Sequence, residues 1–203
     1  RRRLGTAAGE LVLVATGRLA DQKNHRVAVE ALAQLPGGHL VIAGEGPNRP
    51  ALEAQARALG VADRLHLVGA VAREDLGEVL AAGDIYLFPS IWETFGLAGV
   101  EAAMAGLPVI AADLPVMREV LGPDADADAP SAVLRLHAPS DAAGLAAAIE
   151  AMWAAYPSAD ERRRFAERMR RAHGLERMFD LYQALLGAPQ SAPAPTPTPE
   201  TAS

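Results

Sequence analysis

Short runs of apolar residues alternate along the chain with segments whose apolar residues recur every three or four positions. The first run, residues 11–16, is almost continuously apolar, as in a strand buried on both faces. Similar runs follow at residues 39–44, 64–69, 84–88, 108–111 and 131–136. Strands that alternate with helices in this way predict βα units and a mostly parallel sheet.

The segments between these runs have the spacing of helices. Asn24 is a candidate N-cap for a helix that continues to about Leu35, and Gly60 and Gly106 stand where glycine ends a helix. Further helices are expected at residues 50–59, 73–82, 95–105, 116–121 and 141–153, and two more within 158–187, broken at Gly174. Together these elements predict a Rossmann-like, doubly wound α/β domain of about six strands. Such a sheet binds ligands beyond the carboxyl ends of its strands.

The ends of the chain differ in composition from its middle. Residues 1–10 begin with three arginines but lack the apolar stretch of a signal peptide, so we interpret them as a linker or N-terminal extension. Residues 11–187 carry the expected domain. Residues 188–203 contain five prolines, which oppose both helices and strand ladders, so a disordered tail is expected there.

Composition and charge narrow the classes of function. The chain has 203 residues, a net charge of −6 and only 4% aromatic residues, which argues against nucleic acid as a partner. The absence of cysteine excludes disulfides and thiolate metal sites. No apolar run approaches the roughly 18 residues of a membrane span. We expect a cytoplasmic protein without a membrane-spanning segment.

The loop after the first strand carries two cations. Gly17 permits a tight turn, and Arg18 and Lys23 follow it just before a helix. An arginine can chelate two phosphate oxygens and a lysine adds a point charge, so the loop suits a diphosphate. Two solvated surface cations are the alternative interpretation. The loop lacks the Gly-x-Gly-x-x-Gly pattern of a dinucleotide site.

The loop after the fourth strand carries two carboxylates near an expected helix start. Gly96 stands where that helix begins and offers free backbone N–H groups, with Glu93 just before it and Glu101 inside it. Carboxylates beside an anion site suit ligand hydroxyls, which donate to them. Alternatively, both are ordinary acidic residues near a helix. The Gly44-Glu-Gly-Pro47 segment after the second strand indicates mainly a turn.

Taken together, these motifs resemble the donor-binding, C-terminal half of a retaining glycosyltransferase of family 4, with the GT-B fold. Glu93 and Glu101 have the spacing of its Glu-x7-Glu motif. The other matching segments are 17–23, 44–47, 67–69, 80–84 and 101–110, in the same order, and the resemblance covers residues 11–186. The resemblance implies transfer of a sugar from a UDP-, GDP- or ADP-sugar to a hydroxyl, without a cofactor or a metal.

The resemblance also implies roles for single residues. Arg18 and Lys23 would hold the diphosphate, and Glu93 would bind the transferred sugar, which makes these three the candidate catalytic residues. Glu101 would bind the ribose, and the backbone at Val71 would contact the base. The implied nucleotide-sugar site as a whole consists of Gly17, Arg18, Lys23, Val71, Glu93, Phe95, Gly96, Leu97 and Glu101.

The family pattern also implies a partner. The acceptor site of the family lies in an N-terminal domain, which is expected from a missing half or an equivalent subunit, with peripheral membrane contact possible through that half. The segment 177–186 resembles the terminal helix that packs on it. Glu119 is a looser match, because many members have a Gly-Gly turn in that region.

Other functions remain open. A non-catalytic nucleotide-sugar-binding module is one alternative, and a related epimerase or phosphorylase is another. The aspartates at 124, 126 and 128 superficially offer metal ligands, but Ala129 and Arg135 stand where an EF-hand needs Gly and Glu. The five histidines, at 25, 39, 66, 137 and 173, show no ligand spacing.

Overall fold

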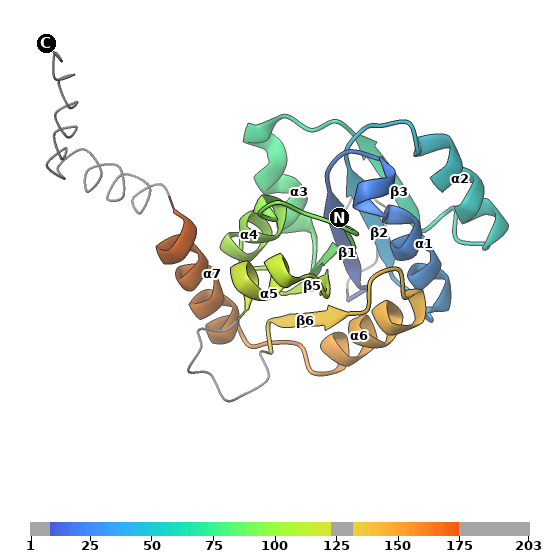
Figure 1. Cartoon of the computed structure of the whole chain (residues 1–203). Helices are drawn as coiled ribbons and strands as arrows, with labels where there is room; N and C mark the ends of the chain where they lie inside the picture. Colours follow the sequence, from blue (N-terminus) through green and yellow to red (C-terminus); the bar gives the residue numbers. More distant parts are fainter. Residues whose placement is uncertain (1–8, 123–131, 175–203) are drawn as a thin grey trace, which may run out of the picture.

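The computed structural model describes residues 9–122 and 132–174, which form a six-stranded parallel sheet between two layers of helices (Figure 1). The strand order is β3-β2-β1-β4-β5-β6, so the order reverses between β1 and β4. The strands are β1 (Val12–Thr16), β2 (His39–Ala43), β3 (Leu65–Gly69), β4 (Ile85–Phe88), β5 (Val109–Ala112) and β6 (Leu134–His137). The predicted doubly wound α/β fold is confirmed.

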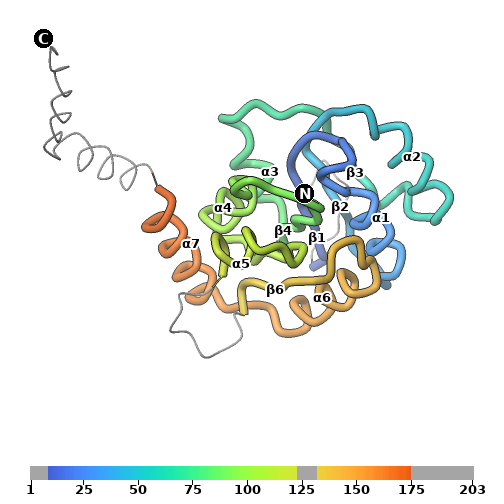
Figure 2. The backbone as a smooth tube through the Cα atoms, viewed as in Figure 1, coloured from blue at the N-terminus to red at the C-terminus, as the bar shows by residue number. Residues whose placement is uncertain are grey.

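Helices cover both faces of the sheet, as Figure 2 shows. One face carries α1 (His25–Gln34), α2 (Arg49–Ala58) and α6 (Ala142–Ala154). The other carries α3 (Leu76–Ala82), α4 (Leu97–Met104), α5 (Pro115–Leu121) and α7 (Ala159–His173). Two short 3-10 turns, η2 (Asp21–Lys23) and η3 (Arg73–Asp75), precede α1 and α3.

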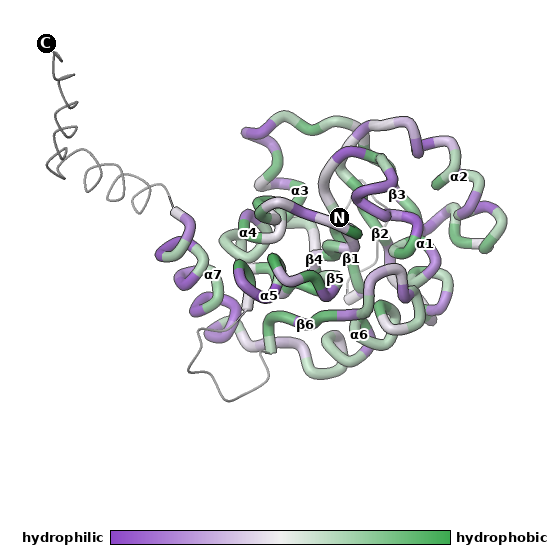
Figure 3. Tube along the Cα trace, viewed as in Figure 1, coloured by the Kyte–Doolittle hydropathy of each residue, from purple (hydrophilic) through white to green (hydrophobic). Residues whose placement is uncertain are grey.

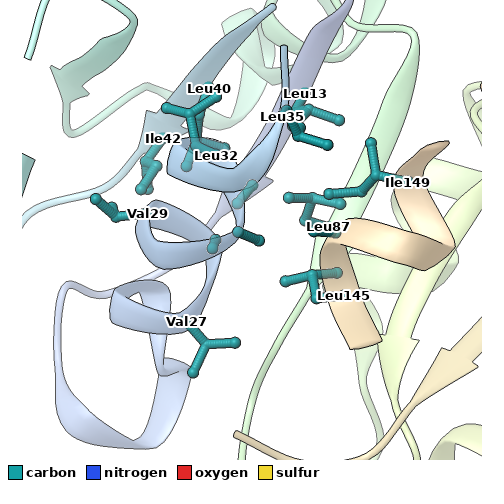
Figure 4. Packing of buried hydrophobic residues seen from close by; sticks show 14 of the residues in the cluster. Leu13, Val27, Val29, Leu32, Leu35, Leu40, Ile42, Leu87, Leu145 and Ile149 are labelled. Carbon is teal, nitrogen blue, oxygen red and sulfur yellow. The ribbon is translucent and has the colours of Figure 1, made fainter. Parts of the chain in front are cut away.

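The central strands are apolar throughout because both of their faces are covered. In β1, Leu13 packs toward α1 and α6 (Figure 4), whereas Val12 and Val14 pack into the core on the α4 side. All five residues of β1 are buried. The strands are accordingly rich in hydrophobic residues in Figure 3, and α7 is largely hydrophilic. This burial explains why β1 has no alternating pattern in the sequence.

Three predicted boundaries are wrong in detail. The helix expected at residues 95–105 begins only at Leu97, because Gly96 has a left-handed backbone (φ +83°) that cannot continue a helix. The helix expected at 73–82 is divided into η3 and α3. The last strand begins at Leu134 and includes His137, because its backbone pairs with β5 as far as Ala112.

Asn24 occupies the predicted N-cap position, but its side chain does not cap the helix. Its backbone is left-handed (φ +50°), and its Nδ2 atom donates instead to Ser140 Oγ at 3.2 Å. The two predicted stops are confirmed: Gly60 and Gly106, both with positive φ, follow the ends of α2 and α4. The first of the two helices predicted within 158–187 also ends where expected, since α7 ends at His173.

Several predictions fall on residues outside the described ranges. These are the helix expected after Gly174, the tail 188–203, the aspartates 124–128 and most of the segment 1–10. Within residues 9–122 and 132–174, no helix has the length and apolar character needed to cross a membrane.

Candidate functional site

The loops after β1, β2 and β3 are bonded to one another at the carboxyl edge of the sheet. Gly17 N–H donates to the Ala43 carbonyl at 2.9 Å, and Gly44 N–H donates to the Gly69 carbonyl at 2.8 Å. A Cβ atom at Gly44 would lie closer than 3.0 Å to the Gly17 carbonyl oxygen, a distance that real side chains do not adopt. Gly44 therefore allows the close packing of two loops, whereas the predicted turn is found only at Pro47 and Asn48.

Lys23 and Glu93 form an ion pair between the loops that follow β1 and β4. Lys23 Nζ contacts Glu93 Oε1 and lies 5.3 Å from the centre of the Phe88 ring. The two side chains are only 19% and 9% exposed. The sequence predicted that Lys23 binds the diphosphate and Glu93 the sugar. Their contact with each other was not predicted. The pair spans the point where the strand order reverses.

Gln22 connects the same two loops and was missed by the sequence analysis. Its carbonyl oxygen accepts from Ile91 N–H at 2.9 Å, and its side-chain Nε2 donates to the Trp92 carbonyl at 3.2 Å. These bonds fix the segment that carries Glu93 relative to the segment that carries Lys23. Nothing in the sequence marks Gln22 except its place beside Lys23.

Arg18 differs from Lys23 in its surroundings. Its side chain is exposed, and it forms no ion pair with another described residue. It follows Gly17, whose φ of +126° is accessible mainly to glycine. The loop therefore presents one solvated guanidinium beside one partly buried ammonium, and both cations are at the carboxyl edge where the sequence predicted them.

The start of α4 is held in place by packing beneath Gly96. A Cβ at Gly96 would collide with the side chain of Met117. The Gly96 carbonyl accepts from Gly99 and Val100, so the N–H groups of Leu97 and Ala98 precede the first hydrogen bond of the helix. They are the backbone donors that a phosphate could use, and the positive end of the helix dipole favours an anion there.

Glu101 lies one turn into α4, with its side chain 27% exposed. Its Oε1 accepts from Arg73 Nη2 at 3.3 Å, and Arg73 is 83% exposed. An ion pair with so exposed an arginine contributes little and leaves the carboxylate available to other donors. Val71 is half-buried between β3 and η3. Arg73 was not identified from the sequence.

A buried polar pair lies beneath the loops. Thr16 Oγ1 and Tyr86 Oη are 2.7 Å apart and join the last residue of β1 to β4. Burial raises the pKa of Tyr86, and the nearby charges of Glu101 and Glu93 act in the same direction. The phenol therefore stays protonated and neutral. Its role is to connect the two central strands, and no motif in the sequence predicted the pair.

Four large apolar side chains are exposed in the segment that contains Glu93. Phe95 is 44% exposed, and its ring meets His173 of α7 in an edge-to-face contact with centroids 5.3 Å apart. The others are Ile91, Trp92 and Leu97, which are 41%, 57% and 51% exposed. All four belong to the loop before α4 or to the first residue of that helix. Of these, Phe95 and Leu97 were predicted site residues.

The geometry agrees with comparisons to known proteins. The sequence profile described as "Glycosyl transferases group 1" matches residues 1–172. Glycogen synthase of Mycobacterium tuberculosis is 36% identical over 174 residues, which are 83% of this chain and 39% of that protein. The chain thus spans well under two thirds of this relative.

Solved structures give the same result. Sucrose-phosphate synthase from Thermosynechococcus elongatus superposes with a TM-score of 0.76 at 28% identity, over 93% of this chain and 48% of that one. HepE of Anabaena, in complex with UDP, superposes with a TM-score of 0.80 at 23% identity, over 93% of this chain and 51% of that one. The fold is that of one half of a GT-B glycosyltransferase, and the chain belongs to the glycosyl transferases group 1 family.

Proposed function

We propose that this chain binds a nucleoside-diphosphate sugar and is the donor-binding half of a retaining glycosyltransferase of family 4. The observation that carries the proposal is the Lys23–Glu93 pair at the reversal of strand order. It places a cation and a carboxylate side by side next to the start of α4. A sugar diphosphate has both complementary groups, an anion and hydroxyls, on adjacent parts of one molecule.

The diphosphate is held by three sources of positive charge. Arg18 supplies an exposed guanidinium, Lys23 an ammonium, and the N–H groups of Leu97 and Ala98 complete the site. When the diphosphate binds, Lys23 exchanges part of its contact with Glu93 for phosphate oxygens. Glu93 then turns its free oxygen toward hydroxyls of the sugar. In the bound state Lys23 therefore contacts the diphosphate and Glu93 contacts the sugar.

The nucleoside occupies the side of the site toward β3. Glu101 accepts from ribose hydroxyls in place of the weakly held Arg73, and the backbone near Val71 contacts the base. The UDP in the HepE structure and the sugar-transferring relatives support a nucleotide sugar as the ligand. UDP, GDP and ADP remain equal candidates for the nucleotide.

The chemical step breaks the bond between the anomeric carbon and the diphosphate oxygen. Arg18 and Lys23 stabilise the negative charge that develops on the departing diphosphate. The acceptor hydroxyl forms the new bond on the face that the diphosphate leaves, so the configuration is retained, and its proton passes to the leaving phosphate oxygen. We propose that the acceptor is held by a second domain or subunit and that cationic side chains do the work of a metal ion.

Calorimetry with UDP, GDP and ADP tests the proposal. We expect one of the three to bind the chain with a one-to-one stoichiometry, and the corresponding sugar nucleotide to compete with it. Failure of all three nucleotides to produce heat or a thermal shift at millimolar concentration would refute the donor site.

A further inference from the structure

A pocket of about 490 Å³ lies beside the candidate donor site but is not part of it. Its apolar wall includes Leu19 and Leu52, which belong to the core on the α1 side of the sheet. Phe88, against which Lys23 lies, belongs to the core on the opposite side. Asp21 of η2 and Ile91 line the pocket, whereas Lys23 and Glu93 do not. The volume falls in the range of pockets for small molecules.

Neutral polar side chains surround this pocket. Asn24 donates to Ser140 Oγ, and Gln55 Nε2 donates to Glu30 Oε1 at 3.0 Å. Asn48 Nδ2 donates to Asp21 Oδ1 at 2.7 Å. In each case the bond uses the amide nitrogen, and the amide oxygen accepts from no other described residue. The lining residues thus include three amides whose oxygen has no donor among the described residues, and one serine.

The pocket has no excess of charge. Its two charged side chains are Asp21 and Arg26, and each has a partner, Asn48 and Glu30 respectively. The carboxylate of Asp21 would repel a phosphate, whereas it accepts readily from a hydroxyl. The first turns of α1 and α2 also line this pocket and add free backbone N–H groups. The lining thus offers donors and acceptors together, which suits an uncharged molecule with several hydroxyls.

His25 at the base of the pocket supplies an independent observation. Its side chain is 3% exposed, and neither ring nitrogen has a hydrogen-bond partner among the described residues. Burial, together with the nearby Lys23, lowers the pKa of His25 to about 4, so the ring is neutral near pH 7 and has one donor and one acceptor. The Gly17 carbonyl lies near the ring and opposes this shift, without the geometry of a hydrogen bond.

Buried polar atoms without partners are uncommon, and a bound water, ion or ligand is one explanation for them. The His25 ring lines the pocket, and its two nitrogens are covered in this structure, so a ligand hydroxyl would reach them only by displacing part of the lining. We propose that this pocket binds an uncharged, hydroxyl-rich small molecule the size of one sugar ring. The proposal does not depend on the donor site.

Nuclear magnetic resonance on the isotope-labelled chain tests the pocket with myo-inositol, D-glucose and inorganic phosphate as probes. The His25 ring signals, assigned with a His25→Gln variant, report on binding. Ala51→Trp fills the pocket from α2, and Ala54→Trp places the same side chain on an exposed position of that helix outside the pocket. We expect a saturable shift of the His25 signals with at least one polyol, retained in Ala54→Trp and weakened at least about tenfold in Ala51→Trp.

Three results would overturn the proposal: no saturable shift with either polyol, a shift that is equal in both tryptophan variants, or a shift with phosphate alone. The last would identify an anion site. UDP is titrated separately into the same samples. If the chain binds a polyol but not UDP, the pocket proposal is upheld and the donor site is refuted. If it binds UDP but neither polyol, the donor site is upheld and the pocket proposal is refuted.

Discussion

A Cβ atom at Gly44 would collide with the backbone carbonyl oxygen of Gly17, because the loops after β1 and β2 cross in direct backbone contact. Gly44→Ala should therefore push the Arg18 loop away from the sheet. We expect a loss of about 1–3 kcal/mol in unfolding free energy, typical of overpacking in a tight site. Urea denaturation measures this loss.

Gly77→Ala is the matched control for that substitution. Gly77 lies in α3, and a Cβ there meets nothing within 4 Å. Alanine is the better helix former by about 1 kcal/mol, so this variant should be as stable as the original or more so. Equal effects of both substitutions would show that the crossing of the loops does not constrain Gly44.

Removing either cation should weaken nucleoside-diphosphate binding. Arg18→Ala and Lys23→Ala each delete one charge-assisted contact, worth about 1.5–3 kcal/mol, or roughly 10- to 150-fold in affinity. Arg57→Ala, on an exposed position of α2, removes the same charge away from the site. Calorimetry should show no change for Arg57→Ala, and equal losses in all three variants would indicate attraction by net charge alone.

Glu93→Ala should distinguish the sugar from the diphosphate. The substitution removes the partner of Lys23 and leaves that ammonium free for phosphate, so affinity for the nucleoside diphosphate should be kept or increased. Affinity for the sugar nucleotide should fall by roughly tenfold or more, because hydroxyl contacts are lost. Glu167→Ala, which removes an exposed carboxylate on α7, is the control. A similar loss for both ligands would contradict the division of roles.

The sequence predicted Lys23 and Glu93 as site residues but did not predict their contact with each other. Both residues were identified, since each follows an apolar strand at a motif position. Their contact depends on β1 and β4 being neighbours, and they are 70 positions apart. Periodicity assigns residues to strands, but the order of strands arises from packing of the whole sheet. Gln22 was missed for the same reason.

Helix ends were predicted correctly where the conformation of a single residue determines them. Gly60 and Gly106 ended their helices as expected, because their left-handed conformations follow from the chain near them. The side chain of Asn24 could not be predicted in this way. Its position before the helix was correct, but its Nδ2 atom donates to Ser140 Oγ, 116 positions away. His25 could not be interpreted from sequence at all, since its neutral state comes from burial by distant parts of the chain.

Acidic pH should destabilise the fold through His25. Its folded pKa of about 4 lies below the ordinary value of 6.5, so the unfolded chain binds the proton first. The stability that His25 contributes is complete above pH 6.5 and is lost as the pH falls toward 4, with a loss of about 2 kcal/mol at pH 5. Urea denaturation of the original chain and of His25→Gln at pH 7.5 and 5 measures it. If the pH dependence is equally steep in the variant, other groups cause it.

The 203 residues alone should bind the donor without transferring its sugar. Transfer requires an acceptor hydroxyl held near the anomeric carbon, and such positioning supplies about 7–11 kcal/mol of barrier lowering. In the described residues, Glu93 and the start of α4 would face the donor from one side only, and neither Lys23 nor Glu93 lines the pocket at His25.

An assay with a UDP-, GDP- or ADP-sugar and simple hydroxyl acceptors should therefore give at most slow hydrolysis. Addition of the N-terminal half of a group 1 glycosyltransferase as a separate chain should raise transfer, because it would supply the opposite wall. If the added half does not raise transfer in the Lys23→Ala variant, the activity belongs to the candidate donor site that contains Lys23. Efficient transfer by the chain alone would place a complete acceptor site within it, and the pocket at His25 would then be the first position to test.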